Sequence, residues 1–150
     1  MNSLQFVYLW HDVDVVEVRV VADNGQFRGT ADAYVGIGNL SEAAALLKGF
    51  PEHSQDSREF TFGAFGPKYA GGGARLELYC RDLAGHPTIR ATIESNGDRL
   101  CDSDLRRKEN PDSATVYLDF EPAGLDQFLE QLEHLERLRS GTASLRTLAT

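Results

Sequence analysis

Two runs of alternating apolar and polar residues, joined by a tight-turn sequence, most constrain how this chain can fold. The first run, residues 13–21, is rich in β-branched residues and places a valine on one face at every second position from residue 16 to residue 20. The second run covers residues 26–35. Asn24-Gly25 lies between them, and this pair tolerates the positive φ angles of a short hairpin turn. The pattern predicts an antiparallel hairpin.

The same alternation recurs in five further segments, at residues 5–10, 59–65, 74–81, 88–94 and 114–120. In the first of these, Phe6, Tyr8 and Trp10 are expected on one face of the strand, because side chains alternate across a strand. Hairpin connections outnumber helical crossovers in the chain. This favours an antiparallel sheet of about six to seven strands, covered on one face by helices.

Two segments have the spacing of helices. Residues 39–48 form a short alanine-rich helix that either Asn39, with Glu42 reaching back, or Ser41 is expected to cap. The longer helix is C-terminal. It starts near Pro122 and carries a stripe at positions 125, 128, 129, 132, 135 and 138, all leucine except Phe128. We therefore predict a single α+β domain over residues 1–150, with a flexible tail from about residue 140.

The charge and the cysteine content narrow the class of protein. The formal net charge is −8 at pH 7, so phosphate backbones and anionic membranes are poor partners, whereas a basic protein is a suitable one. Two cysteines in 150 residues make no disulfide framework. No signal peptide and no apolar run long enough for a membrane span is recognised. A bacterial protein of the cytoplasm with reduced thiols is the expectation.

Candidate metal sites each have a simpler structural interpretation. His11 and Asp12 lie near Asp14 and Glu17, but the strand alternation separates these acids onto two faces and favours a solvated strand edge. Cys80, His86 and Cys101 lack the tight spacing of a zinc site, and Cys80 continues the apolar face of its strand. No metal and no cofactor is predicted.

Catalytic motifs are not recognised either. The chain has no GxSxG elbow, and the glycines at positions 71–73 lack the Lys-Ser/Thr and the following helix of a phosphate loop. We interpret them as a flexible connection. The basic run at positions 106–108 is short and lies among acids, as in a solvated loop. The sequence predicts a protein that is not an enzyme.

A resemblance covers about residues 74–138. The hairpin over residues 74–93 has Asp82-Leu83-Ala84-Gly85-His86 at its turn, and a strand over residues 114–120 leads through Glu121-Pro122-Ala123-Gly124 into the leucine-rich helix. This arrangement resembles small bacterial proteins similar to the WapI-type immunity families of polymorphic toxin systems. The resemblance implies a protein that binds and neutralises a toxin, and it implies no catalytic residue. Asp82, Gly85 and His86 are interpreted as turn-forming residues, with Gly85 supplying a positive φ.

The leading hypothesis is a non-enzymatic protein-binding module, an immunity protein whose partner is a basic toxin. The acids expected to contact that partner lie in the polar segment and on the last helix: Asp98, Asp102, Asp104, Glu109, Asp112, Glu130 and Glu133. One alternative is a small ligand-binding domain or an enzyme of unknown type, with a pocket lined by Tyr8, Trp10, Phe62, Phe65 and Tyr69. A second alternative is a structural homodimer.

Overall fold

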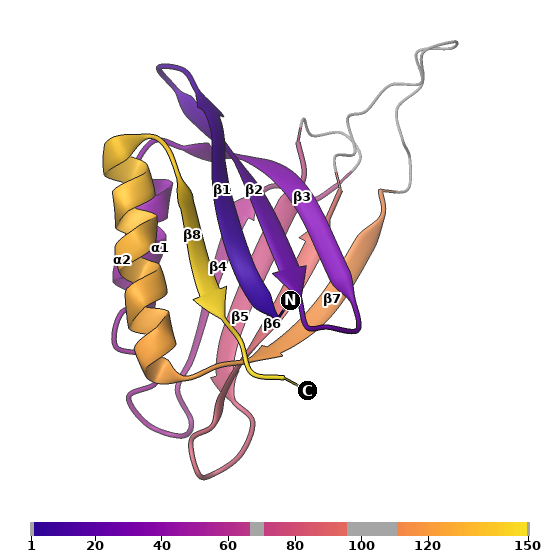
Figure 1. Ribbon diagram of the computed structural model, residues 1–150, viewed down its shortest axis with the longest axis vertical. Coiled ribbons are helices and arrows are strands. Elements are labelled where there is room, and N and C mark those ends of the chain that lie inside the picture. Colours follow the sequence, from indigo (N-terminus) through magenta and orange to yellow (C-terminus); the bar gives the residue numbers. More distant parts are fainter. Residues whose placement is uncertain (1, 67–70, 96–110, 150) are drawn as a thin grey trace.

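A computed structural model describes residues 2–66, 71–95 and 111–149 of the chain (Figure 1). The described residues form eight strands and two helices, in the order β1 (Ser3–His11), β2 (Val15–Asp23), β3 (Arg28–Gly36), α1 (Asn39–Leu47), β4 (Ser57–Gly63), β5 (Gly73–Cys80), β6 (Pro87–Glu94), β7 (Ser113–Asp119), α2 (Pro122–Leu138) and β8 (Thr142–Arg146).

The strands form two antiparallel sheets of four rather than one sheet of six to seven. The first sheet has the order β3-β2-β1-β8 and the second the order β4-β5-β6-β7. The α+β class, the antiparallel pairing and the longer C-terminal helix are as the sequence predicts. The number of sheets differs from the prediction, because alternation shows which face of a strand is buried but not which sheet the strand joins.

Small residues on β3 allow it to lie directly across one end of the second sheet. A Cβ atom added at Gly29 would come 3.2 Å from the Cβ atoms of Ala114 and Ile93, and one added at Gly72 would come 3.1 Å from the Cβ of Ala31. The Gly72 N–H also donates a 2.7 Å hydrogen bond to the Asp32 carbonyl oxygen. The glycines at positions 71–73 are buried at this crossing. They are a close-packed contact rather than the flexible connection that the sequence suggested.

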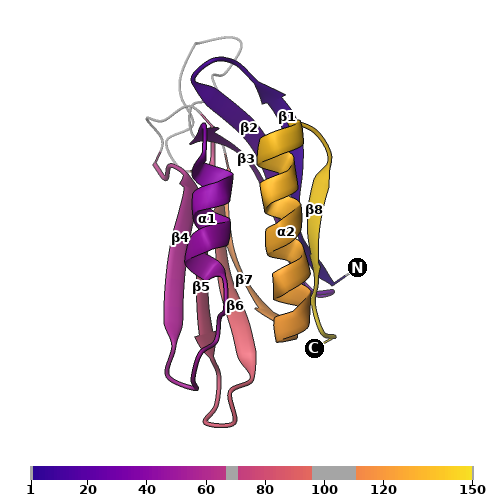
Figure 2. The ribbon, with the colours of Figure 1, turned by 90° about the vertical axis from the view of Figure 1, so that its left-hand side faces the viewer.

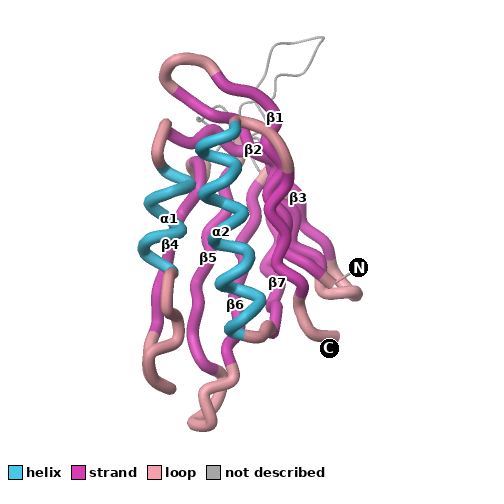
Figure 3. The backbone as a smooth tube through the Cα atoms, turned by 60° about the vertical axis from the view of Figure 1, so that its left-hand side comes forward, coloured by secondary structure: helices cyan, strands magenta, loops and turns pink. Residues whose placement is uncertain are grey.

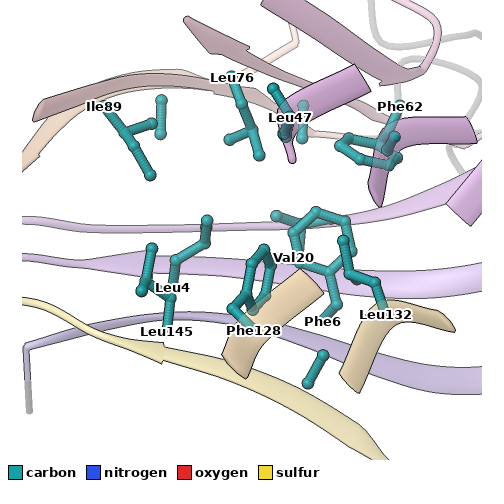
Figure 4. Close-up of a cluster of buried hydrophobic side chains, with 14 of the residues drawn as sticks. Leu4, Phe6, Val20, Leu47, Phe62, Leu76, Ile89, Phe128, Leu132 and Leu145 are labelled. Carbon is teal, nitrogen blue, oxygen red and sulfur yellow. The ribbon is translucent and has the colours of Figure 1, made fainter. Parts of the chain in front are cut away.

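Large side chains fill the space where the sheets diverge, and the two helices cover it. Figure 2 shows α1 beside β4 and α2 beside β8, and Figure 3 shows the two helices next to each other. The Phe6 ring lies 4.7 Å from the Phe62 ring and 5.7 Å from the Phe128 ring, centroid to centroid. These three residues join the first sheet, the second sheet and α2 in one apolar core (Figure 4).

The ends of α1 are held differently from the sequence prediction. Gly38, not Asn39 or Ser41, is the N-cap residue, and the Glu136 Oε1 atom on α2 accepts a 3.1 Å hydrogen bond from the Leu40 N–H in the first turn. The Asn39 Oδ1 atom instead accepts a 2.6 Å hydrogen bond from the Gly36 N–H, which shapes the turn before the helix. At the other end, the Arg58 Nη1 atom donates to the carbonyl oxygens of Leu46 and Lys48, at 3.2 and 2.6 Å. A guanidinium from β4 thus satisfies the last carbonyls of α1.

The helix α2 begins at Pro122, as predicted, and buries five residues of its apolar stripe. Leu138, the last residue of the stripe, is 65% exposed instead. Arg139 follows with a φ of 56° and ends the helix.

The chain after α2 is ordered as a strand, which corrects the predicted flexible tail. Strand β8 pairs with β1 from Thr142 opposite Val7 to Arg146 opposite Ser3. Leu145 is fully buried. The Gln131 Oε1 atom on α2 accepts a 2.7 Å hydrogen bond from the Ser144 N–H. The last helix and the last strand therefore stabilise each other.

Candidate partner-binding surface

Exposed apolar side chains gather where β1 ends, β2 begins and β3 ends. The antiparallel register of the first sheet brings these three points together, and β8 starts beside the end of β1. In Figure 1 the β1–β2 hairpin projects past the end of α2 at the top of the view. We call this region the hairpin end, and its exposed apolar residues are Leu9, Trp10, Val13, Tyr34, Ile37 and Leu138.

A β-bulge in β1 places Trp10 on the surface. Tyr8 pairs with Val18, but the next paired residue is Trp10 opposite Glu17, so Leu9 is the extra residue. Tyr8 faces the core with Phe6, whereas Trp10 points outward and is 50% exposed. The prediction that Phe6, Tyr8 and Trp10 share one face is therefore wrong at Trp10, because the bulge shifts the alternation by one residue.

Trp10, Glu17 and Tyr34 form a row across three adjacent strands on the outward face of the first sheet. Trp10 pairs with Glu17, and Glu17 pairs with Tyr34. The charge of the nearby Glu17 carboxylate is the largest cause that raises the pKa of Tyr34. A Cβ added at Gly71 would lie 2.6 Å from the Tyr34 ring, so the ring rests directly on that glycine.

The charge of the hairpin end is negative. Residues 9–18 contain Asp12, Asp14 and Glu17 and no lysine or arginine. Arg19 follows in β2, but its guanidinium binds both carboxylate oxygens of Asp32, at 2.8 and 3.1 Å. A basic group from outside would therefore meet the carboxylates of Asp12, Asp14 and Glu17 at this end of the sheet.

Asp12 has a structural role in the hairpin. Its Oδ1 atom accepts hydrogen bonds from the backbone N–H groups of Asp14 and Val15, both at 2.8 Å. These two bonds, that from Val15 first, lower the pKa of Asp12 and keep its carboxylate charged. Within the part of the chain that the structure describes, no group of three or more His, Cys, Asp or Glu side chains could hold a metal ion.

The predicted contact acids are only partly brought together. Asp98, Asp102, Asp104 and Glu109 lie outside the described residues. Asp112 is exposed just before β7, and its carbonyl oxygen accepts a 2.8 Å hydrogen bond from the Ser95 N–H.

Glu130 and Glu133 do share a surface feature, a groove of about 470 Å³ between α1 and α2. Asp126, Lys48 and Leu129 also line this groove. Its lining is thus mainly acidic, with one lysine, and it lies on a different part of the molecule from the row on the first sheet.

The β5–β6 turn contains the three residues assigned to it from the sequence. Gly85 adopts a φ of 84°, in the left-handed region that favours glycine. The Asp82 Oδ1 atom accepts the His86 N–H at 3.2 Å, and its Oδ2 atom lies 2.7 Å from His86 Nδ1. The hydrogen bond with the His86 ring is the largest cause that lowers the pKa of Asp82. The histidine serves to close the turn.

The residues of the alternative sites are in different surroundings. Cys80 is partly buried, which raises the pKa of its thiol, and Cys101 lies outside the described residues. Among the proposed pocket aromatics, Phe62 is in the core, Phe65 lies under the Arg75 guanidinium and Tyr69 is not described. Tyr8 packs against the core, whereas Trp10 is on the outer face of the sheet.

The sequence matches no family model, and neither a curated protein nor a solved structure is similar to it at a significant level. No helix in the described ranges is both long enough and apolar enough to cross a membrane. Function must therefore be inferred from the chain's own residues.

Proposed function

We propose that this protein is a non-enzymatic protein-binding module that holds a basic partner protein at the hairpin end. The observation that carries the proposal is the row in which two exposed aromatic side chains, Trp10 and Tyr34, flank the Glu17 carboxylate. Tryptophan and tyrosine dominate the energetic centres of protein interfaces. Bulges often re-aim a side chain at a functional surface, and the bulge in β1 directs this tryptophan to water.

The free energy gained by covering Trp10 is large enough to contribute to the recognition of a partner. Trp10 is 50% exposed, and covering the exposed half of such a side chain would remove about 100 Å² from water, worth roughly 2.5 kcal/mol. Tyr34 and the exposed aliphatic residues around it add to this area. The apolar surface thus supplies affinity, and the carboxylates supply selectivity for a basic partner.

The wider charge of the molecule supports the same partner. The net charge of −8 attracts a basic protein over a distance of about one Debye length. Glu130 and Glu133, exposed on α2, belong to this field. Together with the resemblance of residues 74–138 to WapI-type immunity proteins, this supports a toxin as the partner and neutralisation by binding as the function.

A second candidate function is the binding of a small cationic ligand between the helices. The groove lined by Glu130, Glu133 and Lys48 has a volume of about 470 Å³, within the range of small-molecule sites. Substituting both glutamates by glutamine would then abolish ligand binding and leave partner binding through the hairpin end intact.

Co-expression in a bacterial host tests the proposed function. Each gene adjacent to that of this protein is expressed alone and together with wild-type protein, Trp10→Ala or Phe27→Ala. Phe27 is a matched control, because it is 68% exposed and lies in the β2–β3 turn at the opposite end of the same sheet. We expect the wild type and Phe27→Ala to restore growth against one toxic product, and Trp10→Ala to fail while remaining folded. Equal protection by all three proteins, or no protection by any, would refute the proposal.

A further inference from the structure

The spacing of the row at the hairpin end fits one kind of chemical group. Adjacent strands are about 4.8 Å apart, so the backbones of Trp10 and Tyr34 are separated by roughly 10 Å, with Glu17 between them. A cation is attracted to an aromatic ring within about 6 Å of the ring centroid. A cationic side chain placed above Glu17 could therefore contact both rings and the carboxylate at once.

The row is organised before any partner arrives. Tyr34 is held from one side by Gly71, whose missing Cβ leaves room for the ring, and the Glu17 carboxylate is close enough to raise the pKa of the Tyr34 hydroxyl. The Tyr34 ring is therefore fixed at one side of the row. A binding group that is fixed in advance loses less entropy when a ligand binds.

The neighbouring row shows that this face of the sheet can hold a guanidinium. Arg19 and Asp32 pair across β2 and β3 on the same face, with both carboxylate oxygens engaged. A guanidinium is planar, stacks on aromatic rings and binds a carboxylate with two parallel N–H groups. An ammonium attracts a carboxylate as a point charge and has no plane to stack on a ring. The chemistry of the row, a carboxylate flanked by two rings, suits the planar cation better.

We propose that Trp10, Glu17 and Tyr34 form a subsite that takes an arginine side chain of the partner protein. The inference rests on the proposed function, since it names the group by which the partner is recognised at the hairpin end. Glu17 accepts the guanidinium N–H groups, and the rings of Trp10 and Tyr34 cover its flanks and exclude water from the ion pair.

The fluorescence of Trp10 provides a direct test, because it is the single tryptophan of the chain. The probes are N-acetyl-arginine amide, N-acetyl-lysine amide and N-acetyl-citrulline amide, the last of which has nearly the shape of arginine without its charge. We expect a saturable change in fluorescence with the arginine probe in the millimolar range, weakened by salt. Citrulline should bind at least about tenfold more weakly, with lysine between the two.

Variants separate the contributions of the row. Glu17→Gln should weaken arginine binding about tenfold, and Tyr34→Leu should weaken it by removing one ring. Glu59→Gln is the matched control, because Glu59 is an exposed glutamate on β4 of the other sheet, 3.8 Å from an arginine. It should bind the probe as the wild type does. Circular dichroism and thermal unfolding of each variant establish that it is folded before binding is compared.

Two outcomes overturn the inference. One is an equal response to arginine and citrulline, or to arginine and lysine, and the other is unchanged arginine binding in folded Glu17→Gln. Failure of the proposed function gives a different pattern, namely neutralisation that survives Trp10→Ala. Neutralisation that is lost in Trp10→Ala but retained in Glu17→Gln would support the docking surface and contradict the arginine subsite.

Discussion

Replacing Gly72 by alanine is the substitution whose effect the structure determines most sharply. An added Cβ would lie 2.3 Å from the carbonyl oxygen of Glu94 and 3.1 Å from the Cβ of Ala31. The first contact is with backbone, so rotation of a side chain cannot relieve it. The φ of Gly72 lies outside the left-handed region, and the expected cost is therefore one of contact rather than of backbone conformation.

The magnitude follows from these distances. Comfortable contacts lie near 3.5 Å, so the Glu94 carbonyl, on the neighbouring strand of the same sheet, would have to move by roughly 1 Å, and Ala31 of the first sheet by a few tenths of an ångström. Overpacking of this kind costs about 1–3 kcal/mol. The 2.7 Å hydrogen bond from Gly72 N–H to the Asp32 carbonyl would be strained as well, at about 1 kcal/mol. A total of about 2–4 kcal/mol corresponds to a fall in Tm of roughly 5–15 °C for a chain of this size.

Differential scanning calorimetry of Gly72→Ala beside Gly124→Ala provides the assay. Gly124 is in α2, and a Cβ added there would meet the Leu145 Cδ1 atom at 3.4 Å and the Arg146 carbonyl oxygen at 4.0 Å, both ordinary contacts. Alanine is favoured over glycine within a helix, so Gly124→Ala should raise stability by about 0.5–1 kcal/mol. The two substitutions should thus shift Tm in opposite directions. A Gly72→Ala protein as stable as the wild type would refute the close packing around Gly72.

Three further predictions concern stability. Arg58→Met should lower the free energy of unfolding by about 3 kcal/mol, because it frees the last carbonyls of α1 and leaves the Asp56 carboxylate unpaired. Urea unfolding should show this as a lower midpoint at constant m. Hydrogen bonds from Arg58, and then from the Glu52 N–H, lower the pKa of Asp56 below its value in the unfolded chain. The contribution of Asp56 to the free energy of unfolding is therefore complete above about pH 4 and is lost as the pH falls through the lowered pKa. The Tm of Asp56→Asn, measured between pH 5 and 2, should accordingly depend less on pH than that of the wild type. Removing residues 142–150 should unfold the protein, as followed by circular dichroism, because it deletes the fully buried Leu145; an unchanged Tm would mean that the tail is dispensable.

The sequence predicted individual strands and helices well because each is a local pattern. Seven of the eight strands in the described residues correspond to segments of alternation, and both helices follow their expected spacing. Strand β8 was missed because it has five residues, of which Ala143 and Leu145 alone face the core. Its strand conformation depends on pairing with β1 at the other end of the chain, which a local pattern cannot show.

The arrangement of the elements was less predictable for a related reason. The glycines at positions 71–73 have the composition of a loop, and their packing role depends on β3, which is distant in sequence.

The candidate surface could not be predicted from the local sequence pattern either. A single bulge at Leu9 decides whether Trp10 lies in the core or in water, and alternation alone placed it with Phe6. The mixture of large apolar and acidic residues at positions 9–14 was the one local sign of this surface.

Amide hydrogen exchange, measured on the protein alone and bound to the toxin that the proposed function assigns to it, tests the location of the proposed binding surface most directly. We predict slower exchange in residues 9–18 and 34–38 on binding, with no change in residues 24–28 at the opposite end of the same sheet. Protection confined to the groove between α1 and α2, or to residues 24–28, with the hairpin end unaffected, would contradict the account.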